Sequence, residues 1–176
     1  MTENLYTPNC IRTYSDIYIN PFNPLPEKIN IEDIAHSLSM QCRFAGHLPK
    51  FYSVAQHSVQ CSFMVAPKFK LQALLHDASE AYLLDIPSPV KNLIPFYKQA
   101  ENKLMDMIAD KFGFTYPLQE PVEAADKQML QFEWDYIMLR KPLFDNTWDI
   151  QWPQNYAKTR FLAEYYKLTE QNLQSQ

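Results

Sequence analysis

Four polar residues stand inside apolar segments of the sequence, and together they could bind a metal ion. They are His57 in SVAQHSVQC, the adjacent His76 and Asp77 in LLHDASEAY, and Asp126 in VEAADKQML. Two imidazoles and two carboxylates form a suitable ligand set for a divalent ion such as Zn, Co, Mn, Ni or Mg. Each residue alone has a simpler interpretation, because a single buried histidine is usually a hydrogen-bonded core residue. The complete set predicts a metal site.

Two further acids follow the His-Asp pair. Glu80 comes three residues after Asp77, and Asp85 ends the apolar segment just before IPSP. In a continuous helix, Glu80 would lie one turn from His76 on the same face. It is therefore the candidate general acid or base, acting through a water molecule. Structural alternatives stay open, because Glu80 could pair with a lysine and Asp85 could simply end the helix.

The order of these residues resembles that of the HD-domain metal-dependent phosphohydrolases, which carry H…HD…D on successive helices. The resemblance covers about residues 31–140 and includes RFAGH at 43–47 and FYSVAQHS at 51–58. It is closest to the bacterial 5'-deoxynucleotidases and the phage dATP triphosphohydrolases. It implies an HD-domain helical bundle, a divalent metal cofactor, a small (deoxy)nucleotide substrate and a homo-oligomer.

On this resemblance, five residues would contact the substrate. Asp85 would accept a hydrogen bond from a sugar hydroxyl. Arg43 and Lys91 would hold phosphate oxygens, the arginine through its planar fork of donors. Phe44 and Pro89 would flank the base or the sugar.

The sequence leaves two classes of substrate open for an enzyme, and it leaves open one function that is not enzymatic. The protein could release phosphate from a deoxynucleoside monophosphate or triphosphate from a dNTP. Lys91 favours the longer phosphate tail, whereas Glu123 places an acid where some triphosphohydrolase-like members carry a lysine. The alternative is a catalytically silent HD protein that binds or senses nucleotides, but the complete ligand set and Glu80 argue against it.

The composition excludes several other classes of protein. Gly46 and Gly113 are the only glycines, which is too few for a GxGxxG motif or a P-loop. A net charge of −4 and a pI near 5.5 provide no basic field for a nucleic acid backbone. No apolar run approaches the length of a membrane span, and three cysteines without a CxxC pair indicate a reducing compartment. We expect a cytoplasmic protein with no nucleic acid or membrane partner.

The spacing of apolar residues and the position of the prolines predict an all-α fold in one domain over residues 1–176. Residues 1–29 read as an irregular leader with a short hairpin in RTYSDIYI, and residues 31–140 form the core that carries the motifs. Three helices are expected to begin at caps, at Asn30, at the capping box of Ser53 and at Ser88. Four more are expected over 69–84, from Pro95 to Gly113, over 118–140 and over 154–173. The segment WDIQWPQN is expected to be a loop.

Overall fold

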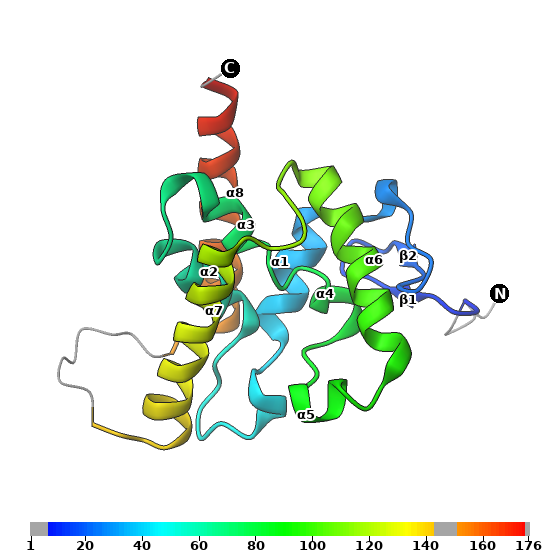
Figure 1. Ribbon diagram of the computed structural model, residues 1–176. Coiled ribbons are helices and arrows are strands. Elements are labelled where there is room, and N and C mark those ends of the chain that lie inside the picture. The colour runs from blue at the N-terminus through cyan, green and yellow to red at the C-terminus, as the bar shows by residue number, and fades with distance from the viewer. Residues whose placement is uncertain (1–6, 143–150, 175–176) are drawn as a thin grey trace.

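The computed structural model describes residues 7–142 and 151–174, and within these ranges the protein is all-α, as predicted (Figure 1). A hairpin of two short strands near the N-terminus is the only sheet in the described part of the chain, and it spans RTYSDIYI and the preceding Ile11. The strands are β1 (Ile11–Arg12) and β2 (Tyr18–Ile19), and the helices are α1 (Ile31–Met40), α2 (Val54–Phe63), α3 (Lys70–Leu74), α4 (Glu80–Leu83), α5 (Ser88–Lys91), α6 (Pro95–Phe112), α7 (Glu120–Glu133) and α8 (Gln154–Gln174). Short 3-10 turns lie at Pro26–Lys28, Phe44–Gly46 and Pro67–Phe69, and a π-helical turn spans Trp134–Met138.

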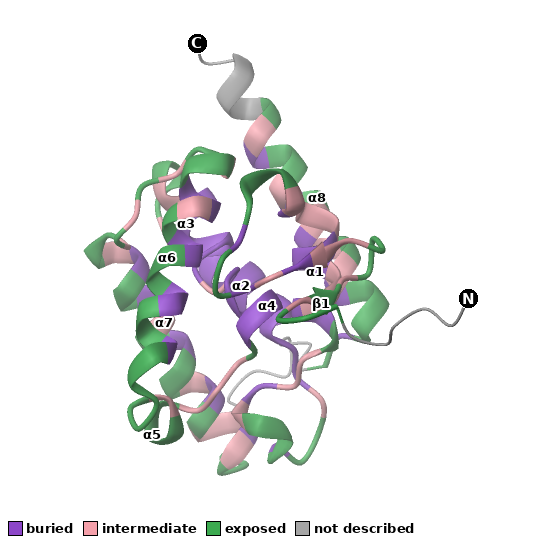
Figure 2. Ribbon diagram, turned by 90° about the vertical axis from the view of Figure 1, so that its right-hand side faces the viewer, coloured by how far each residue is buried: buried purple, intermediate pink, exposed green. Residues whose placement is uncertain are grey.

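Helix α2 lies at the centre of the molecule. The Ser53 hydroxyl caps it by accepting a hydrogen bond from the backbone N of Gln56, as the predicted capping box requires. Every residue from Val54 to Ser62 is buried (Figure 2). The helix packs against α1, α3, α7 and α8. A polar side chain on α2, such as His57, is therefore held among several other elements.

Helices α6 and α7 flank this centre on the face shown in Figure 1. Gly113 ends α6 in the left-handed conformation, with φ of 75°, which glycine adopts without steric cost. The core of the molecule includes Leu104 and Ile108 of α6, Leu38 of α1 and Phe161 of α8. The core is thus formed by segments from both ends and the middle of the described chain, without α7.

The largest departure from the expected elements lies within residues 69–84, which were predicted as one helix. Helix α3 ends at Leu74 and α4 begins at Glu80, so His76 and Asp77 lie in consecutive turns between two short helices. Leu75, with φ of −105° and ψ of 9°, leaves the helical conformation. Adjacent side chains on a regular helix point about 100° apart. In the turns the two side chains are not held at this angle and can point to the same side. His76 Nε2 and Asp77 Oδ2 lie 3.2 Å apart.

Other boundaries differ only slightly. Asn30 caps α1 as expected, by accepting from the backbone N of Asp33. Ser88 is the first residue of α5, and the capping position belongs to Pro87. Part of the predicted loop WDIQWPQN lies outside the described residues. No helix in the described ranges is long and apolar enough to cross a membrane.

Candidate metal centre

The four predicted metal ligands come together around one small volume. His57 Nε2 lies 3.3 Å from His76 Nε2 and 3.1 Å from Asp126 Oδ1. Asp77 Oδ2 lies 3.2 Å from His76 Nε2 and 3.8 Å from His57 Nε2. His76 Nε2 and Asp126 Oδ1 are 3.7 Å apart. Three parts of the chain supply these donors, namely α2, the turns after α3, and α7.

These separations fit the coordination sphere of a divalent ion. Ligands about 2.1 Å from a metal and at angles between about 90° and 109° lie roughly 3.0–3.4 Å from one another. The observed donor separations of 3.1–3.8 Å are close to these values, and the four donors would have to move together only slightly to bind one ion. In addition, His76 Nδ1 lies 2.7 Å from the backbone O of Ala73, which leaves Nε2 of that ring facing the other donors. The residues present therefore fit a metal ion.

The electrostatics of the four side chains agree with a cation-binding site. Burial lowers the pKa of His76, but the carboxylates of Asp77 and Asp126 outweigh this effect and raise that pKa well above its usual value. Burial would raise the pKa of Asp77, yet the two histidines lower it to about 2. The pKa of Asp126 is also lowered, because hydrogen bonds from both histidines outweigh burial. Both carboxylates are thus anionic and ready to ligate.

Cys61 lies next to this cluster. In the described part of the chain, the donor atoms of His57, Cys61 and His76 lie within 4.8 Å of one another and form a group that could hold a metal ion. The Cys61 sulfur is 3.5 Å from Nε2 and 4.0 Å from Nδ1 of His57. The sulfur thus lies at similar distances from both ring nitrogens and farther from Nε2 than the oxygen of Asp126 does. Asp77 and Asp126 are the better placed ligands.

Sequence reasoning missed Glu133, although this residue is completely buried beside the site. Its Oε1 lies 2.6 Å from His57 Nδ1, and its Oε2 accepts a hydrogen bond of 2.8 Å from Arg43 Nε. Glu133 lies seven residues after Asp126, which is the spacing of one face of a helix over two turns. That spacing was the only signal in the sequence that could have revealed it.

Glu80, the candidate general acid or base, is buried, and the charge of Asp77 acts on it. Its Oε2 has no hydrogen-bond partner among the described residues, and its Oε1 lies 3.6 Å from Lys91 Nζ. Burial raises the pKa of Glu80 well above its usual value, and the charges of Asp77 and Asp85 raise it further. Glu80 is therefore a buried carboxyl group with one oxygen that no described residue hydrogen-bonds.

Lys91 is engaged with acids. Its Nζ donates to Glu101 Oε1 at 2.8 Å, in addition to the contact with Glu80, and it lies over the ring of Tyr97. Glu101 also pairs with Lys98, at 3.1 Å. The charge that was expected to attract a phosphate tail is thus already paired with Glu101.

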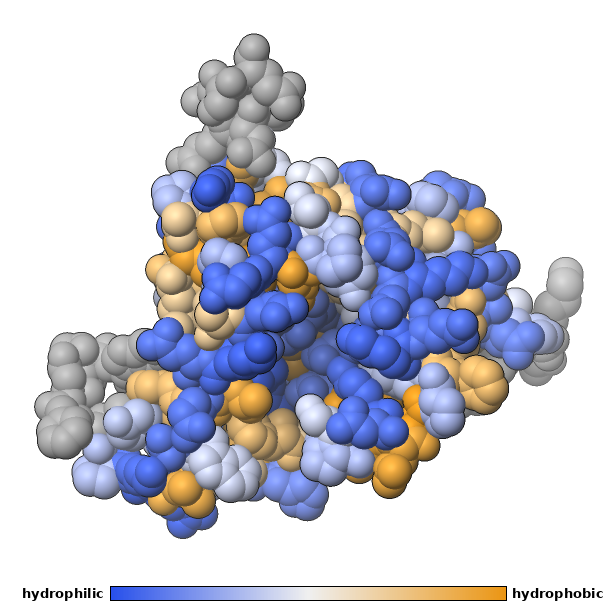
Figure 3. Space-filling view, viewed as in Figure 1, coloured by the Kyte–Doolittle hydropathy of each residue, from blue (hydrophilic) through white to orange (hydrophobic). Residues whose placement is uncertain are grey.

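A cavity of about 590 Å³ opens over the cluster. Figure 3 shows a hollow lined by hydrophilic side chains in the middle of the face, between α7 and α6. The cavity is lined by residues of the turns after α3, of α5 and of α6, and by Asp126. We call it the cleft. Its size is that of a small-molecule site.

The predicted substrate contacts divide into two groups. Lys91 lines the cleft, whereas the other four residues are not among those that line it in the described structure. Arg43 is buried against Glu133, and Phe44 packs near Trp134, with 6.2 Å between the ring centroids. The backbone N of Asp85 donates to Gln41 Oε1, and Pro89 is exposed on α5. Their roles in binding stay predictions.

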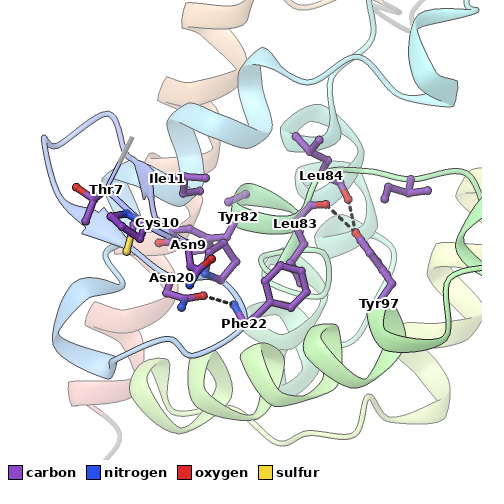
Figure 4. A pocket seen from close by; sticks show the side chains of 14 residues that line it. Thr7, Asn9, Cys10, Ile11, Asn20, Phe22, Tyr82, Leu83, Leu84 and Tyr97 are labelled. Atoms are coloured by element: carbon purple, nitrogen blue, oxygen red, sulfur yellow. Dashed lines mark hydrogen bonds between the residues drawn. The ribbon is translucent and has the colours of Figure 1, made fainter. Parts of the chain in front are cut away.

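Another cavity, of about 910 Å³, lies elsewhere (Figure 4). It is formed by the N-terminal leader and the end of α4, and Phe22 and Tyr82 lie in its wall. The Tyr97 hydroxyl bonds the backbone oxygens of Leu83 and Leu84 at its edge. None of the four metal ligands lines this cavity.

The chain was compared with known proteins. No protein-family model matches it. It is 49% identical over 125 residues to the uncharacterized protein YfdR of Escherichia coli strain K12, a match that covers 70% of this chain and 69% of that protein. The chain belongs to the YfdR family. An uncharacterized protein of Rhodobacter capsulatus is 34% identical over 126 residues, which covers 66% of this chain and 64% of that protein. Neither relative's name states an activity.

Proposed function

We propose that this protein is a divalent-metal-dependent phosphohydrolase of the HD-domain superfamily, acting on small (deoxy)nucleotides. The convergence of four donors from separate parts of the chain at 3.1–3.8 Å carries this proposal. Ordinary buried polar groups pair with one or two partners. A cluster of two imidazoles and two carboxylates beside an open cleft is better explained by a metal ion.

The ion would provide Lewis-acid assistance and a more acidic bound water. The chain supplies the remaining chemistry. Glu80 Oε2, which has no partner among the described residues, can hold the attacking water or pass a proton to the leaving oxygen. The raised pKa of Glu80 suits such a role near neutral pH.

A monophosphate is the substrate we propose. Lys91 is already paired with Glu101 at 2.8 Å, so little positive charge remains for a β- or γ-phosphate. Glu123, an acid where a lysine would favour a triphosphate, is exposed, and its Oε2 lies 3.8 Å from Lys127 Nζ. A silent nucleotide-binding protein is disfavoured because such a protein has no need of a complete ligand set and an unpartnered Glu80.

The test is a product analysis. Metal-loaded protein is incubated with a panel of dNMPs and dNTPs, and the released phosphate, pyrophosphate and triphosphate are identified separately. We expect phosphate from dNMPs at rates well above those for dNTPs. The Lys91→Met variant should lose activity on both substrate classes by a similar factor. A loss confined to dNTPs would instead support the triphosphate substrate, and no hydrolysis of any nucleotide would contradict the proposal.

A further inference from the structure

Glu133 is an ionised carboxylate in the interior of the protein, where an unpaired charge is strongly unfavourable. Its two oxygens serve two different groups, since Oε1 faces His57 Nδ1 and Oε2 accepts from Arg43 Nε. Glu133 therefore accepts hydrogen bonds at both oxygens.

This arrangement constrains the tautomer of His57. A neutral imidazole carries one proton, and carboxylates face both nitrogens of His57, with Glu133 Oε1 at 2.6 Å from Nδ1 and Asp126 Oδ1 at 3.1 Å from Nε2. The shorter contact with Glu133 favours the proton on Nδ1. The lone pair then lies on Nε2, which is the atom that faces His76 and Asp126. Carboxylates that fix a ligating histidine in this way are common around protein metal sites.

We propose that Glu133 is a positioning residue for the metal centre, which holds His57 in the Nδ1–H tautomer and fixes its ring. This inference rests on the metal site of the proposed function and adds a residue outside the ligand set. Helix α7 then has two tasks, because it supplies Asp126 as a ligand and, two turns later, the group that orients another ligand. Arg43 is the second partner that keeps Glu133 anionic and in place.

The main test is the Glu133→Gln variant, with zinc ions as the probe. Arg43 Nε always donates, so the glutamine carbonyl must face it and the amide NH₂ must face His57. The histidine proton would then move to Nε2 and occupy the metal-binding lone pair. In the reverse orientation of the glutamine, its NH₂ group would face Arg43 Nε, so that two hydrogen-bond donors would point at each other. We expect zinc affinity, measured by chelator competition, to fall about 10- to 100-fold, with far-UV circular dichroism unchanged.

A second variant separates positioning from a purely structural ion pair. In Arg43→Met with Glu133→Gln, the carbonyl is free to turn towards His57 Nδ1 and accept its proton. We expect zinc affinity to recover to within about threefold of that of Arg43→Met alone, because the conflict between two donors is gone. A purely structural role predicts that the double variant binds zinc no better than Glu133→Gln. That result would overturn the inference.

The wild-type protein provides a test that does not depend on the folding of any variant. In zinc-loaded protein, long-range ¹H–¹⁵N NMR correlations identify which nitrogen of His57 carries the proton. We expect Nδ1–H, and finding the proton on Nε2 would overturn the inference. Zinc binding that depends on Glu133 in a protein without nucleotide hydrolysis would contradict the proposed function but support this inference. Nucleotide hydrolysis by a protein whose zinc affinity is equal in wild type and Glu133→Gln would support the proposed function but contradict this inference.

Discussion

At the scale of single residues, Glu80 is the side chain whose environment most directly suggests chemistry. It is buried, and its Oε2 has no partner among the described residues. It is not one of the four donors that surround the metal volume. A substitution at Glu80 should therefore separate catalysis from metal binding.

The Glu80→Gln variant should retain the metal and lose activity. Glutamine has nearly the shape of glutamate but cannot transfer a proton, so we expect kcat to fall about 10²-fold or more. Elemental analysis serves as the control and should give the wild-type metal content. Near-normal turnover would contradict the role of Glu80.

The same variant should alter the pH dependence of stability in metal-free protein. Burial raises the pKa of Glu80 in the folded state, so the folded protein disfavours the ionised form. Glu80 therefore adds no penalty at low pH, and its penalty grows as pH rises above the unfolded pKa. We expect Glu80→Gln to be more stable than wild type by about 1 kcal/mol at pH 8 and by less at pH 5, as measured by urea unfolding. A gain that is larger at pH 5 would be inconsistent with this assignment.

At the scale of elements, α2 presents His57 to the site, and its N-terminal cap should be important for stability. Ser53→Ala removes the hydroxyl that accepts from the backbone N of Gln56. We expect the free energy of unfolding to fall by about 1 kcal/mol with metal content unchanged. Ser62→Ala is a matched control in the same buried helix, since its hydroxyl bonds a carbonyl that is already helical. Equal effects of the two variants would argue against a special role for the cap.

The limits of sequence reasoning also appear at this scale. The cap of α2 could be predicted because capping depends on residues close together in the chain. The break between α3 and α4 could not, because Leu74, Leu75 and Ala78 are all buried and apolar, and such a run looks continuous. Glu133 was missed because its partner His57 is 76 residues away. The residue types in apolar segments and their order predicted the ligand set, but only tertiary contacts placed Glu133 beside His57.

At the scale of the whole molecule, the hydrophobic core and the candidate metal centre use largely different residues. The core cluster draws on α1, α2, α3, α4, α6 and α8, while three of the four predicted metal ligands, His76, Asp77 and Asp126, line the cleft. A chain of 176 residues can bury enough apolar surface to fold without a metal. The metal should therefore support activity more than folding.

Metal removal tests this expectation. A ligand that binds only the folded state stabilises it, by about 2.7 kcal/mol when its free concentration is 100 times Kd. We expect chelation to lower Tm by several degrees while the far-UV circular dichroism spectrum at 25 °C stays helical. Loss of helical signal on chelation would show that the metal is needed for folding.

The most direct measurement of the central claim is the metal content of Asp77→Ala beside that of wild type. Asp77 Oδ2 lies within 3.8 Å of both histidine donors and carries a full negative charge, with a pKa of about 2. Losing such a ligand should weaken binding at least 10- to 100-fold. After identical purification and dialysis, elemental analysis should find about one divalent ion per wild-type chain and less than about a tenth of that in Asp77→Ala. Equal metal content in the two proteins would contradict the site.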